Sequence, residues 1–384
     1  MRFLHTSDWH VGKTLKTRSR IDEHAAVLKE ILDIAKHEKV DAVLVTGDLF
    51  DSAAPPPDAE RLVYDFFSDL CGLRIPAVII GGNHDHPRRL GAIREILSRL
   101  DIHVRPEPAR PDSGGIITIN RDSETAIIAA LPFVTAGKIS DAAALMSPEA
   151  GRFQDYAERI GAMAEVLSQS FSAHTINLFL AHLFVDNSIT CGSERDIHVA
   201  KPYAVSAQRF PSTAHYVALG HLHRPQEIAA PAPTYYAGSV LQLDFGEQGQ
   251  EKRVVIIDAH PGKPATIASI PLTAGRTLRS IAGSLEELES QAGAFGDDLL
   301  RVTIRLEQPI PGIADRIREI LPNALHISIE LPRPPGPDES TTNAGADPNQ
   351  LFGAFYRHEY ASDPLEDVAR LFSELYEEQV DASN

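Results

Sequence analysis

The chain has 384 residues, 43% of them hydrophobic and 23% charged, which is the composition of an ordinary folded protein with room for two domains. Its formal net charge of −17 excludes a generally basic surface, so any contact with nucleic acid has to be local or supplied by a partner. The chain contains no run of about 18 apolar residues, so no membrane span is predicted. The two cysteines, Cys71 and Cys191, fit the reducing cytoplasm.

Strand and helix patterns alternate over the first hundred residues. Strands are expected at 2–8, 41–48 and 76–85, and amphipathic helices at 21–40 and 57–70. This alternation predicts α/β layering with parallel strands. One helix is expected near 151–172. The remaining strands, which predict a second sheet packed on the first, are expected at 114–121, 125–133, 175–183, 215–223, 234–240 and 252–259.

The pattern changes near residue 275. Residues 276–331 predict a compact strand–helix–strand unit, a small α+β domain, and residues 332–348 are rich in Pro and Gly and predict a linker. Residues 349–384 predict a helical segment in which Asp363 caps a helix with Pro364 in its first turn. Its apolar stripe predicts packing either on the chain's own body or on another chain, and both alternatives stay open. The residues proposed for docking are Leu365, Val368, Phe372 and Leu375.

Five expected strands end in residue types that bind metal ions. Because ligands bind beyond the carboxyl ends of the strands in layered α/β folds, these ends should converge on one edge. A spacing of two residues points the side chains of Asp8 and His10, and those of His221 and His223, in the same direction. The candidate residues at the strand ends are Asp8, His10, Asp48, Asp51, Asn83, His84, Asp85, His182, His221 and His223.

The mixture of imidazoles, carboxylates and one amide suits Mn²⁺, Fe²⁺ or Zn²⁺ better than Ca²⁺. The set is too large for one tetrahedral ion and fits two divalent ions that share a bridging carboxylate. Such a pair stabilises both the attacking and the leaving oxygen of a phosphoryl displacement. The alternative is a set of unrelated polar residues that cap loops at strand ends.

The motifs "DWH", "GDLFD", "GNHD" and "GHLH", in this order, resemble those of the calcineurin-like metallophosphoesterase superfamily. The stretches "MRFLHTSDWHVGK", "HYVALGHLHRPQ" and "YYAGSVLQLDFGE" resemble its SbcD branch, the bacterial DNA-repair nuclease subunits. The resemblance implies two packed mixed sheets flanked by helices in residues 1–275, a capping domain in 276–331, and a C-terminal segment that docks on a partner.

The resemblance also implies residue roles. One ion would be held by Asp8, His10, Asp48 and His223, and the other by Asp48, Asn83, His182 and His221. His84 would lie over the scissile phosphate, with Asp85 as the residue that orients it. Archaeal and eukaryotic relatives carry a histidine at the position of Asp51, so no catalytic role is assigned to Asp51. The loop 185–197 is expected near the site, without an assigned role.

The implied activity is that of a Mn²⁺-dependent DNA exonuclease with endonuclease activity. It would act on duplex ends and hairpins in repair, recombination and replication, as a homodimer within a heterotetramer with an SbcC-like coiled-coil ATPase. Alternative interpretations are a phosphatase or small-molecule phosphodiesterase, and a scaffold with an inactive site. The basic residues near the site either contact DNA phosphates or form a solvated loop face; they are Lys13, Lys16, Arg18, Arg20, Arg88 and Arg89.

Overall fold

Two six-stranded mixed sheets lie at the centre of residues 1–275 in the computed structural model, which describes the chain except for residues 147–154, 195–202, 333–347, 361 and 382–384. The first sheet has the order β14 (Thr266–Pro271), β13 (Arg253–Asp258), β1 (Arg2–Thr6), β4 (Ala42–Val45), β5 (Ala77–Ile80), β6 (Ile102–Arg105). The second has the order β11 (Gln226–Ile228), β12 (Thr234–Tyr236), β10 (Tyr216–Gly220), β9 (Ile176–His182), β8 (Glu124–Leu131), β7 (Ile116–Arg121).

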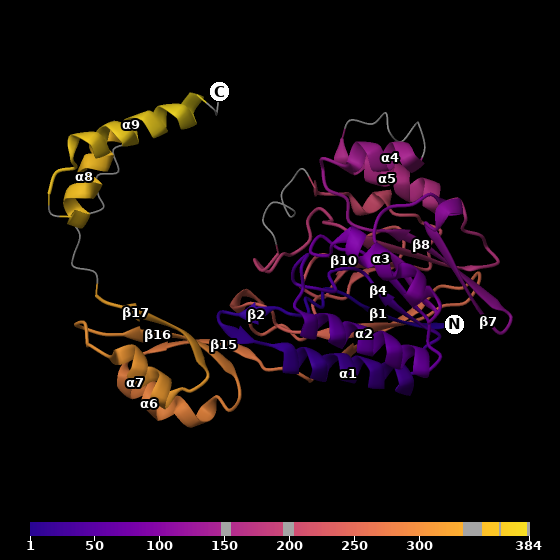
Figure 1. The fold of residues 1–384 in the computed structure, drawn as a ribbon, viewed down its shortest axis with the longest axis horizontal. Helices are drawn as coiled ribbons and strands as arrows, with labels where there is room; N and C mark the ends of the chain where they lie inside the picture. Colours follow the sequence, from indigo (N-terminus) through magenta and orange to yellow (C-terminus); the bar gives the residue numbers. More distant parts are fainter. Residues whose placement is uncertain (147–154, 195–202, 333–347, 361, 382–384) are drawn as a thin grey trace. The chain divides into compact units, whose positions relative to one another are not determined.

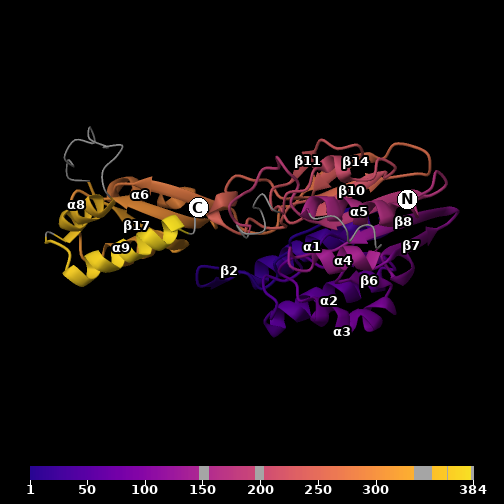
Figure 2. The same ribbon diagram turned by 90° about the horizontal axis from the view of Figure 1, so that it is seen from above.

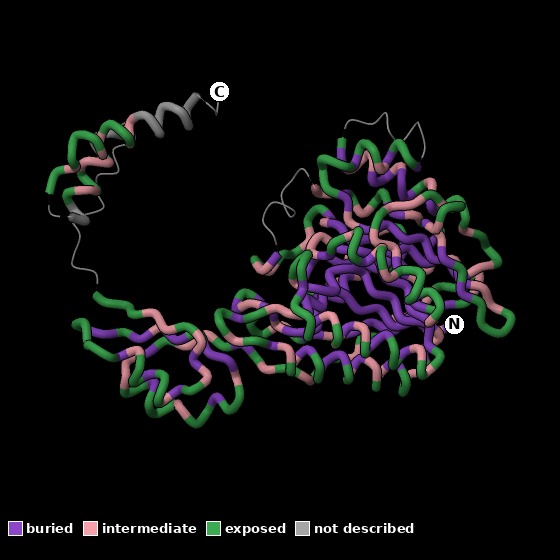
Figure 3. The backbone as a smooth tube through the Cα atoms, viewed as in Figure 1, coloured by how far each residue is buried: buried purple, intermediate pink, exposed green. Residues whose placement is uncertain are grey.

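The central strands of both sheets are parallel to their neighbours, so their carboxyl ends share one edge. In the first sheet β1, β4, β5 and β6 pair in parallel, and in the second β8, β9, β10 and β12 do so. The strands β4, β5 and β10 are continuous apolar runs because both of their faces are covered. In Figure 3 they form the buried purple centre of the body.

Helices cover the outer face of each sheet. The first sheet carries α1 (Ile21–His37), α2 (Pro57–Gly72) and α3 (Pro87–Ser98), and the second carries α4 (Ile139–Met146) and α5 (Tyr156–Ser168). In Figure 1, α4 and α5 lie on the side of the strands opposite to α1 and α2. A separate apolar cluster fills the space between the sheets, with Phe3 and Leu44 from one and Leu178 from the other. The expected layered α/β fold is thus confirmed.

The helix expected near 151–172 is shorter in the structure. It begins after Asp155, whose side chain accepts hydrogen bonds from the backbone N–H groups of Ala157 and Glu158, and it ends at Ser168. The helix α4 was not expected, because only eight residues form it and its apolar positions Ile139, Ala143 and Met146 give a short pattern.

Residues 276–330 form a small three-stranded sheet with two helices. The parallel strands β15 (Leu278–Gly283), β16 (Leu299–Arg305) and β17 (Ala324–Glu330) are connected through α6 (Leu285–Gln291) and α7 (Ile313–Ile320). Ser284 and Glu287 form a capping box at the start of α6. The domain has its own apolar cluster, which includes Val302 and Ile317. The expected strand–helix–strand unit is therefore extended by one strand and one helix at its start.

A hairpin after the first metal-ligand motif reaches this small domain. Its strands are β2 (Thr14–Leu15) and β3 (Arg18–Ser19), and it projects from the body in Figure 2. Leu15 is buried in a cluster with Phe245, Leu278 and Leu299, so one residue of the hairpin packs against two strands of the small domain.

Residues 331–384 form a second compact unit. Its helices are α8 (Pro348–Tyr360) and α9 (Glu366–Asp381), and the rings of Phe352 and Phe372 stack between them with centroids 4.2 Å apart. The expected linker, 332–348, lies almost wholly outside the described residues. Among the described residues, no helix combines the length and the apolar character that a membrane crossing requires.

One expectation about this unit is corrected. Asp363 does not cap α9, which begins at Glu366; its carboxylate instead accepts a hydrogen bond of 2.8 Å from Arg357. Phe372 is half-buried and stacks on Phe352 of α8. Leu365 is 72% exposed and Val368 is half-buried. The surroundings of the Leu375 side chain lie outside the described residues.

Candidate metal centre

The five strand ends that carry the candidate metal ligands meet at one edge of the two sheets. Asp8 and His10 follow β1, Asp48 follows β4 and Asn83 follows β5. From the second sheet, His182 ends β9, while His221 and His223 follow β10. Six of the seven side chains are buried, and Asn83 is half-buried.

Four of these residues have a left-handed backbone. The φ angles are 49° at Asp8, 48° at His10, 51° at Asp48 and 103° at His221. Such conformations are costly for residues with a Cβ and are retained when the surrounding structure enforces them. The neighbouring loops do so, because the N–H of His10 bonds the carbonyl oxygen of Asp48 at 3.0 Å and the N–H of His221 bonds a carboxylate oxygen of Asp8 at 3.0 Å.

Gly82 permits the close approach of two of the loops. A Cβ at this position would overlap with the carboxylate and the backbone nitrogen of Asp48. Any larger residue would therefore push the loop after β5 away from the loop after β4.

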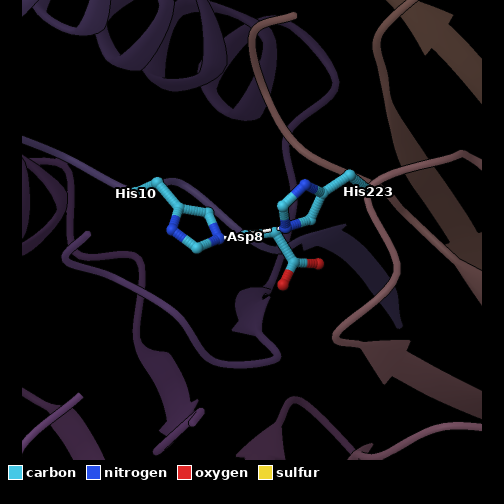
Figure 4. A group of neighbouring side chains, drawn as sticks. All are labelled: Asp8, His10 and His223. Carbon is cyan, nitrogen blue, oxygen red and sulfur yellow. Dashed lines mark hydrogen bonds between the residues drawn. The ribbon is translucent and has the colours of Figure 1, made fainter. Parts of the chain in front are cut away.

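Asp8, His10 and His223 form the first group of donors (Figure 4). The Nε2 atoms of His10 and His223 face one another at 3.1 Å. The Nδ1 atom of His10 points away, 3.3 Å from Oδ1 of Asp51, without the geometry of a hydrogen bond. Both ring Nε2 atoms are thus directed to one point beside Asp8.

Asp48 lies between the two groups of donors. Its Oδ2 atom is 3.5 Å from Nε2 of His10 and 3.5 Å from Nε2 of His182. On the far side, Oδ1 of Asn83 lies 2.9 Å from Nε2 of His182 and 2.8 Å from Nδ1 of His221. One carboxylate oxygen therefore contacts imidazoles of both sheets, as a bridging ligand would.

The donor set fits divalent cations. Nδ1 of His182 lies 2.7 Å from the carbonyl oxygen of Thr46, so that nitrogen carries the hydrogen and Nε2 is an electron-pair donor. This Nε2 faces the Oδ1 atom of Asn83, which is also an electron-pair donor. A cation between such atoms is what satisfies them, and nitrogen and oxygen donors together suit ions such as Mn²⁺ or Zn²⁺.

The electrostatics of the centre also favour a cation. Burial by itself raises the pKa of Asp48, but His182 and His10 beside it hold this pKa well below its usual value. The pKa of Asp8 is raised well above its usual value, first by burial and then by the negative charge of Asp48. Burial lowers the pKa of His10 to about 4, so this ring is neutral and able to bind metal at neutral pH.

His84 lies beside the donors of the first group. Its ring centroid is 4.6 Å from that of His10, and its backbone N–H donates to Oδ1 of Asp48 at 2.8 Å. Its Nδ1 atom lies 2.7 Å from the backbone carbonyl oxygen of Asp51. The side chain of Asp51 also accepts a hydrogen bond of 3.0 Å from Lys13. Asp51, to which no role was assigned, therefore contacts His84 through its backbone carbonyl and lies next to His10 through its side chain.

The expectation that Asp85 orients His84 is wrong. The buried carboxylate of Asp85 accepts hydrogen bonds from the backbone N–H groups of Leu49, Phe50 and Gly82, at 3.3, 3.2 and 3.0 Å. The carboxylate of Asp85 thus connects the loops after β4 and β5. The group that lies next to the ring nitrogen of His84 is the backbone carbonyl of Asp51.

The six basic candidates differ in exposure. Lys16 and Arg88 are exposed, Lys13 and Arg18 are half-buried, and Arg89 is exposed and paired with Glu60 at 2.7 Å. Arg20 is buried, and its guanidinium group bonds to Glu23 and to the carbonyl oxygen of Gln242. The expectation that Arg20 contacts DNA is therefore corrected, since its charge is compensated within the protein.

Sequence reasoning missed the residues behind His223. Its Nδ1 atom lies 3.1 Å from Oε1 of Glu247 and 2.7 Å from Oγ of Ser193. Glu247 in turn pairs with Lys252 at 2.6 Å, and the backbone N–H of His223 bonds to Glu194 at 3.2 Å. Ser193 and Glu194 belong to the loop 185–197, of which residues 195–197 lie outside the described part. A Glu and a Lys next to glycines, in "FGEQGQEK", were the only signal.

Comparisons with known proteins agree with this geometry. The family described as "Calcineurin-like phosphoesterase" matches residues 1–225, and the family described as "Type 5 capsule protein repressor C-terminal domain" matches residues 274–360. The chain therefore belongs to the calcineurin-like phosphoesterase family, in the branch of the SbcD nuclease subunits. It is 34% identical to the SbcD subunit of the nuclease SbcCD from Bacillus subtilis, covering 98% of this chain and 97% of that protein.

Two further relatives are the same subunit of this nuclease in other bacteria. The protein of Rhodobacter capsulatus is 31% identical, with 91% of each chain covered. That of Escherichia coli K12 is 28% identical, with 77% of this chain and 74% of the other covered. The similarity to the Bacillus subtilis protein extends over nearly the whole chain and so includes the small domain as well as the phosphoesterase body.

Proposed function

We propose that this chain is the nuclease subunit of an SbcCD-type complex and hydrolyses phosphodiester bonds in DNA with two divalent metal ions, preferably Mn²⁺. The observation that carries this proposal is the position of Asp48, whose Oδ2 atom is 3.5 Å from a histidine of each sheet. A phosphatase or small-molecule phosphodiesterase is less well supported, because the nuclease relatives match nearly the whole chain. A cytoplasmic location is proposed with this activity, because the relatives are bacterial proteins and bacterial DNA lies in the cytoplasm.

Different residues of the chain are proposed to have different roles in the metal centre. Asp8, His10 and His223 would hold one ion, Asn83, His182 and His221 would hold the other, and Asp48 would contribute to both. When bound, such ions lower the pKa of a water molecule and stabilise charge on the phosphate. The buried carboxylates and imidazoles around the centre would fix the ligand directions.

His84 is the proposed general acid or charge-stabilising group. The carbonyl oxygen of Asp51 accepts from Nδ1 and fixes the ring, so a proton would be exchanged at Nε2. Lys16 and Arg88, both exposed next to the ligand loops, are proposed to contact DNA phosphates.

The other parts are proposed to bring DNA and the partner to this body. Residues 1–275 form the nuclease domain, 276–331 the capping domain and 349–384 the segment that docks on a coiled-coil ATPase. Leu351, Phe355, Leu365 and Leu371 are exposed apolar side chains of this last segment, which favours a partner over packing within the chain. The complex is proposed to be a heterotetramer that contains a homodimer of this chain and acts on duplex ends and hairpins.

Degradation of a linear DNA duplex in the presence of Mn²⁺ tests the proposed activity. The full chain is measured with and without the coiled-coil ATPase and ATP, next to Asp48→Asn and the control Asp58→Asn, which changes an exposed carboxylate on α2. We expect wild type and Asp58→Asn to degrade DNA and Asp48→Asn to be inactive. Rapid hydrolysis of a small phosphomonoester without any cleavage of DNA would refute the nuclease proposal.

Removal of residues 349–384 tests the docking segment. The shortened chain should keep its metal ions and lose the complex with the ATPase on size-exclusion chromatography. Co-elution of the shortened chain with the ATPase would show that the partner binds elsewhere.

A further inference from the structure

The short turn at residues 244–248 lies directly behind the metal ligand His223. Its 3₁₀ helix, η6 (Phe245–Glu247), carries Glu247, whose side chain is fully buried. Oε1 of this carboxylate is 3.1 Å from Nδ1 of His223 and 2.6 Å from Oγ of Ser193. The imidazole is therefore held from behind by a carboxylate and a hydroxyl group.

Glu247 forms a buried ion pair with Lys252. Nζ of Lys252 donates to Oε2 of Glu247 at 2.6 Å and to the backbone carbonyl oxygen of His223 at 2.9 Å. The ion pair thus fixes both the ring and the backbone of one ligand.

This arrangement selects the form of His223 that binds metal. An ionised carboxylate only accepts hydrogen bonds, so Nδ1 of His223 keeps its hydrogen and Nε2 is the nitrogen that would bind the ion. Hydrogen bonds of this kind to a ligating histidine typically change metal affinity by about 10–100-fold.

The opposite side of the same turn holds the small domain of residues 276–330. The ring of Phe245 is buried with Leu278 and Leu299, and the guanidinium carbon of Arg301 lies 5.0 Å from the centre of that ring. Oε1 of Gln248 accepts a hydrogen bond of 2.7 Å from the backbone N–H of Ser280. One turn of five residues therefore contacts a metal ligand on one side and two strands of the small domain on the other.

We infer that Glu247 is a positioning residue for the metal ligand His223, and that the turn at residues 244–248 couples the small domain to the occupancy of the metal centre. The inference rests on the proposed metal centre. Because Glu247, Phe245 and Gln248 belong to one short segment, a displacement of the small domain shifts the carboxylate behind His223. By thermodynamic linkage, metal binding in turn stabilises the contact of the turn with β15.

Titration of the full chain with Mn²⁺ by calorimetry tests the positioning role. Glu247→Gln removes the charge behind His223, and the matched control Glu23→Gln removes a half-buried carboxylate that pairs with Arg20. We expect Glu247→Gln to weaken one of two Mn²⁺ sites by about 10–100-fold and to leave the other unchanged. Glu23→Gln should leave both sites unchanged.

A second variant covers the case in which Glu247→Gln does not fold. Ser193→Ala removes the other polar group next to Nδ1 of His223 and keeps the ion pair of Glu247 with Lys252. It should weaken the same Mn²⁺ site several-fold. Unchanged affinities in the folded variants would overturn the positioning role while leaving the metal centre in place. A wild-type chain that binds no Mn²⁺ would overturn the metal centre, and the inference with it.

Amide hydrogen exchange tests the coupling. The reporter is the N–H of Ser280, which is bonded to Gln248, and the internal control is the N–H of Leu321 at the end of α7, bonded to Ile317. Addition of Mn²⁺ should slow exchange at Ser280 in the wild type, not at Leu321, and the effect should be lost in Glu247→Gln. Exchange at Ser280 that does not respond to Mn²⁺ in the wild type would overturn the coupling.

Discussion

Nε2 of His10 and Nε2 of His223 lie 3.1 Å apart, although 213 positions separate the two residues in the chain. Two nitrogens at this distance need either a shared proton or a shared cation between them. In the absence of metal, the carboxylates around His223 favour a shared proton. Burial by itself lowers the pKa of His223, but Glu247, Asp8 and Glu194 raise it above its usual value.

The first prediction is that metal binding releases protons. Because the pKa of His223 is raised from 6.5, the metal-free ring is protonated at that pH and a metal ion has to displace the proton. The apparent affinity for Mn²⁺ should fall about tenfold per pH unit as the pH is lowered through this pKa. Calorimetry in two buffers with different heats of ionisation measures the protons released. The exposed-histidine variant His260→Ala should release as many as wild type, and equal heats in both buffers would contradict the prediction.

The second prediction is that His84 and Asp85 have different roles, one in the reaction and the other in stability. His84→Ala should keep two bound metal ions, because His84 is not in either donor group that we propose, and should lower kcat by about 10²–10⁴-fold. A loss of bound metal in this variant, measured by elemental analysis, would show that His84 is a ligand.

Asp85→Asn should act on stability instead. Asparagine has one acceptor oxygen for three backbone N–H groups, so the free energy of unfolding should fall by about 1–3 kcal/mol. Urea denaturation of the metal-free chain measures this change. An unchanged midpoint would mean that these hydrogen bonds do not hold the two loops together.

The third prediction concerns two glycines. Gly82→Ala should lower metal affinity by more than about 100-fold, since its Cβ would displace Asp48, the proposed bridging ligand. Gly72→Ala is the matched control, because a Cβ at this position of α2 meets no atom within 4 Å. This control should bind metal as wild type does and gain up to about 1 kcal/mol of stability. Equal metal binding by the two variants would show that the loops can move apart without loss of the site.

The fourth prediction distinguishes two arginines in DNA binding. Arg88→Ala should weaken DNA binding and reduce the slope of log affinity against log salt by about 1, as expected for one lost phosphate contact. Arg20→Met should leave this slope unchanged and destabilise the protein by about 3–5 kcal/mol, because Glu23 loses its buried partner. Salt titrations of DNA binding and urea denaturation measure both quantities. A lower salt slope in Arg20→Met would contradict the burial of this charge.

The layered fold and the position of the donors could be predicted from local patterns. Apolar runs such as "DAVLVTGD" are followed within three residues by a carboxylate or an imidazole, and parallel strands carry these residues to one edge. The apolar stripe of the C-terminal segment did not decide whether this segment packs on the chain's own body or on another chain. Phe372 belongs to the same stripe as Leu365, but Phe372 stacks on Phe352 of α8, whereas Leu365 is 72% exposed.

The sequence by itself determined the strand ends, the residue types that converge there and the family, because each of these depends on residues that are close together in the chain. The tertiary structure decided which partner each of them has. Asp85 bonds to backbone groups more than 30 positions away as well as to its own loop. His223 is held by Ser193 and Glu247, which lie 30 and 24 positions from it. Such contacts depend on how distant loops pack, and no local pattern of residues specifies them.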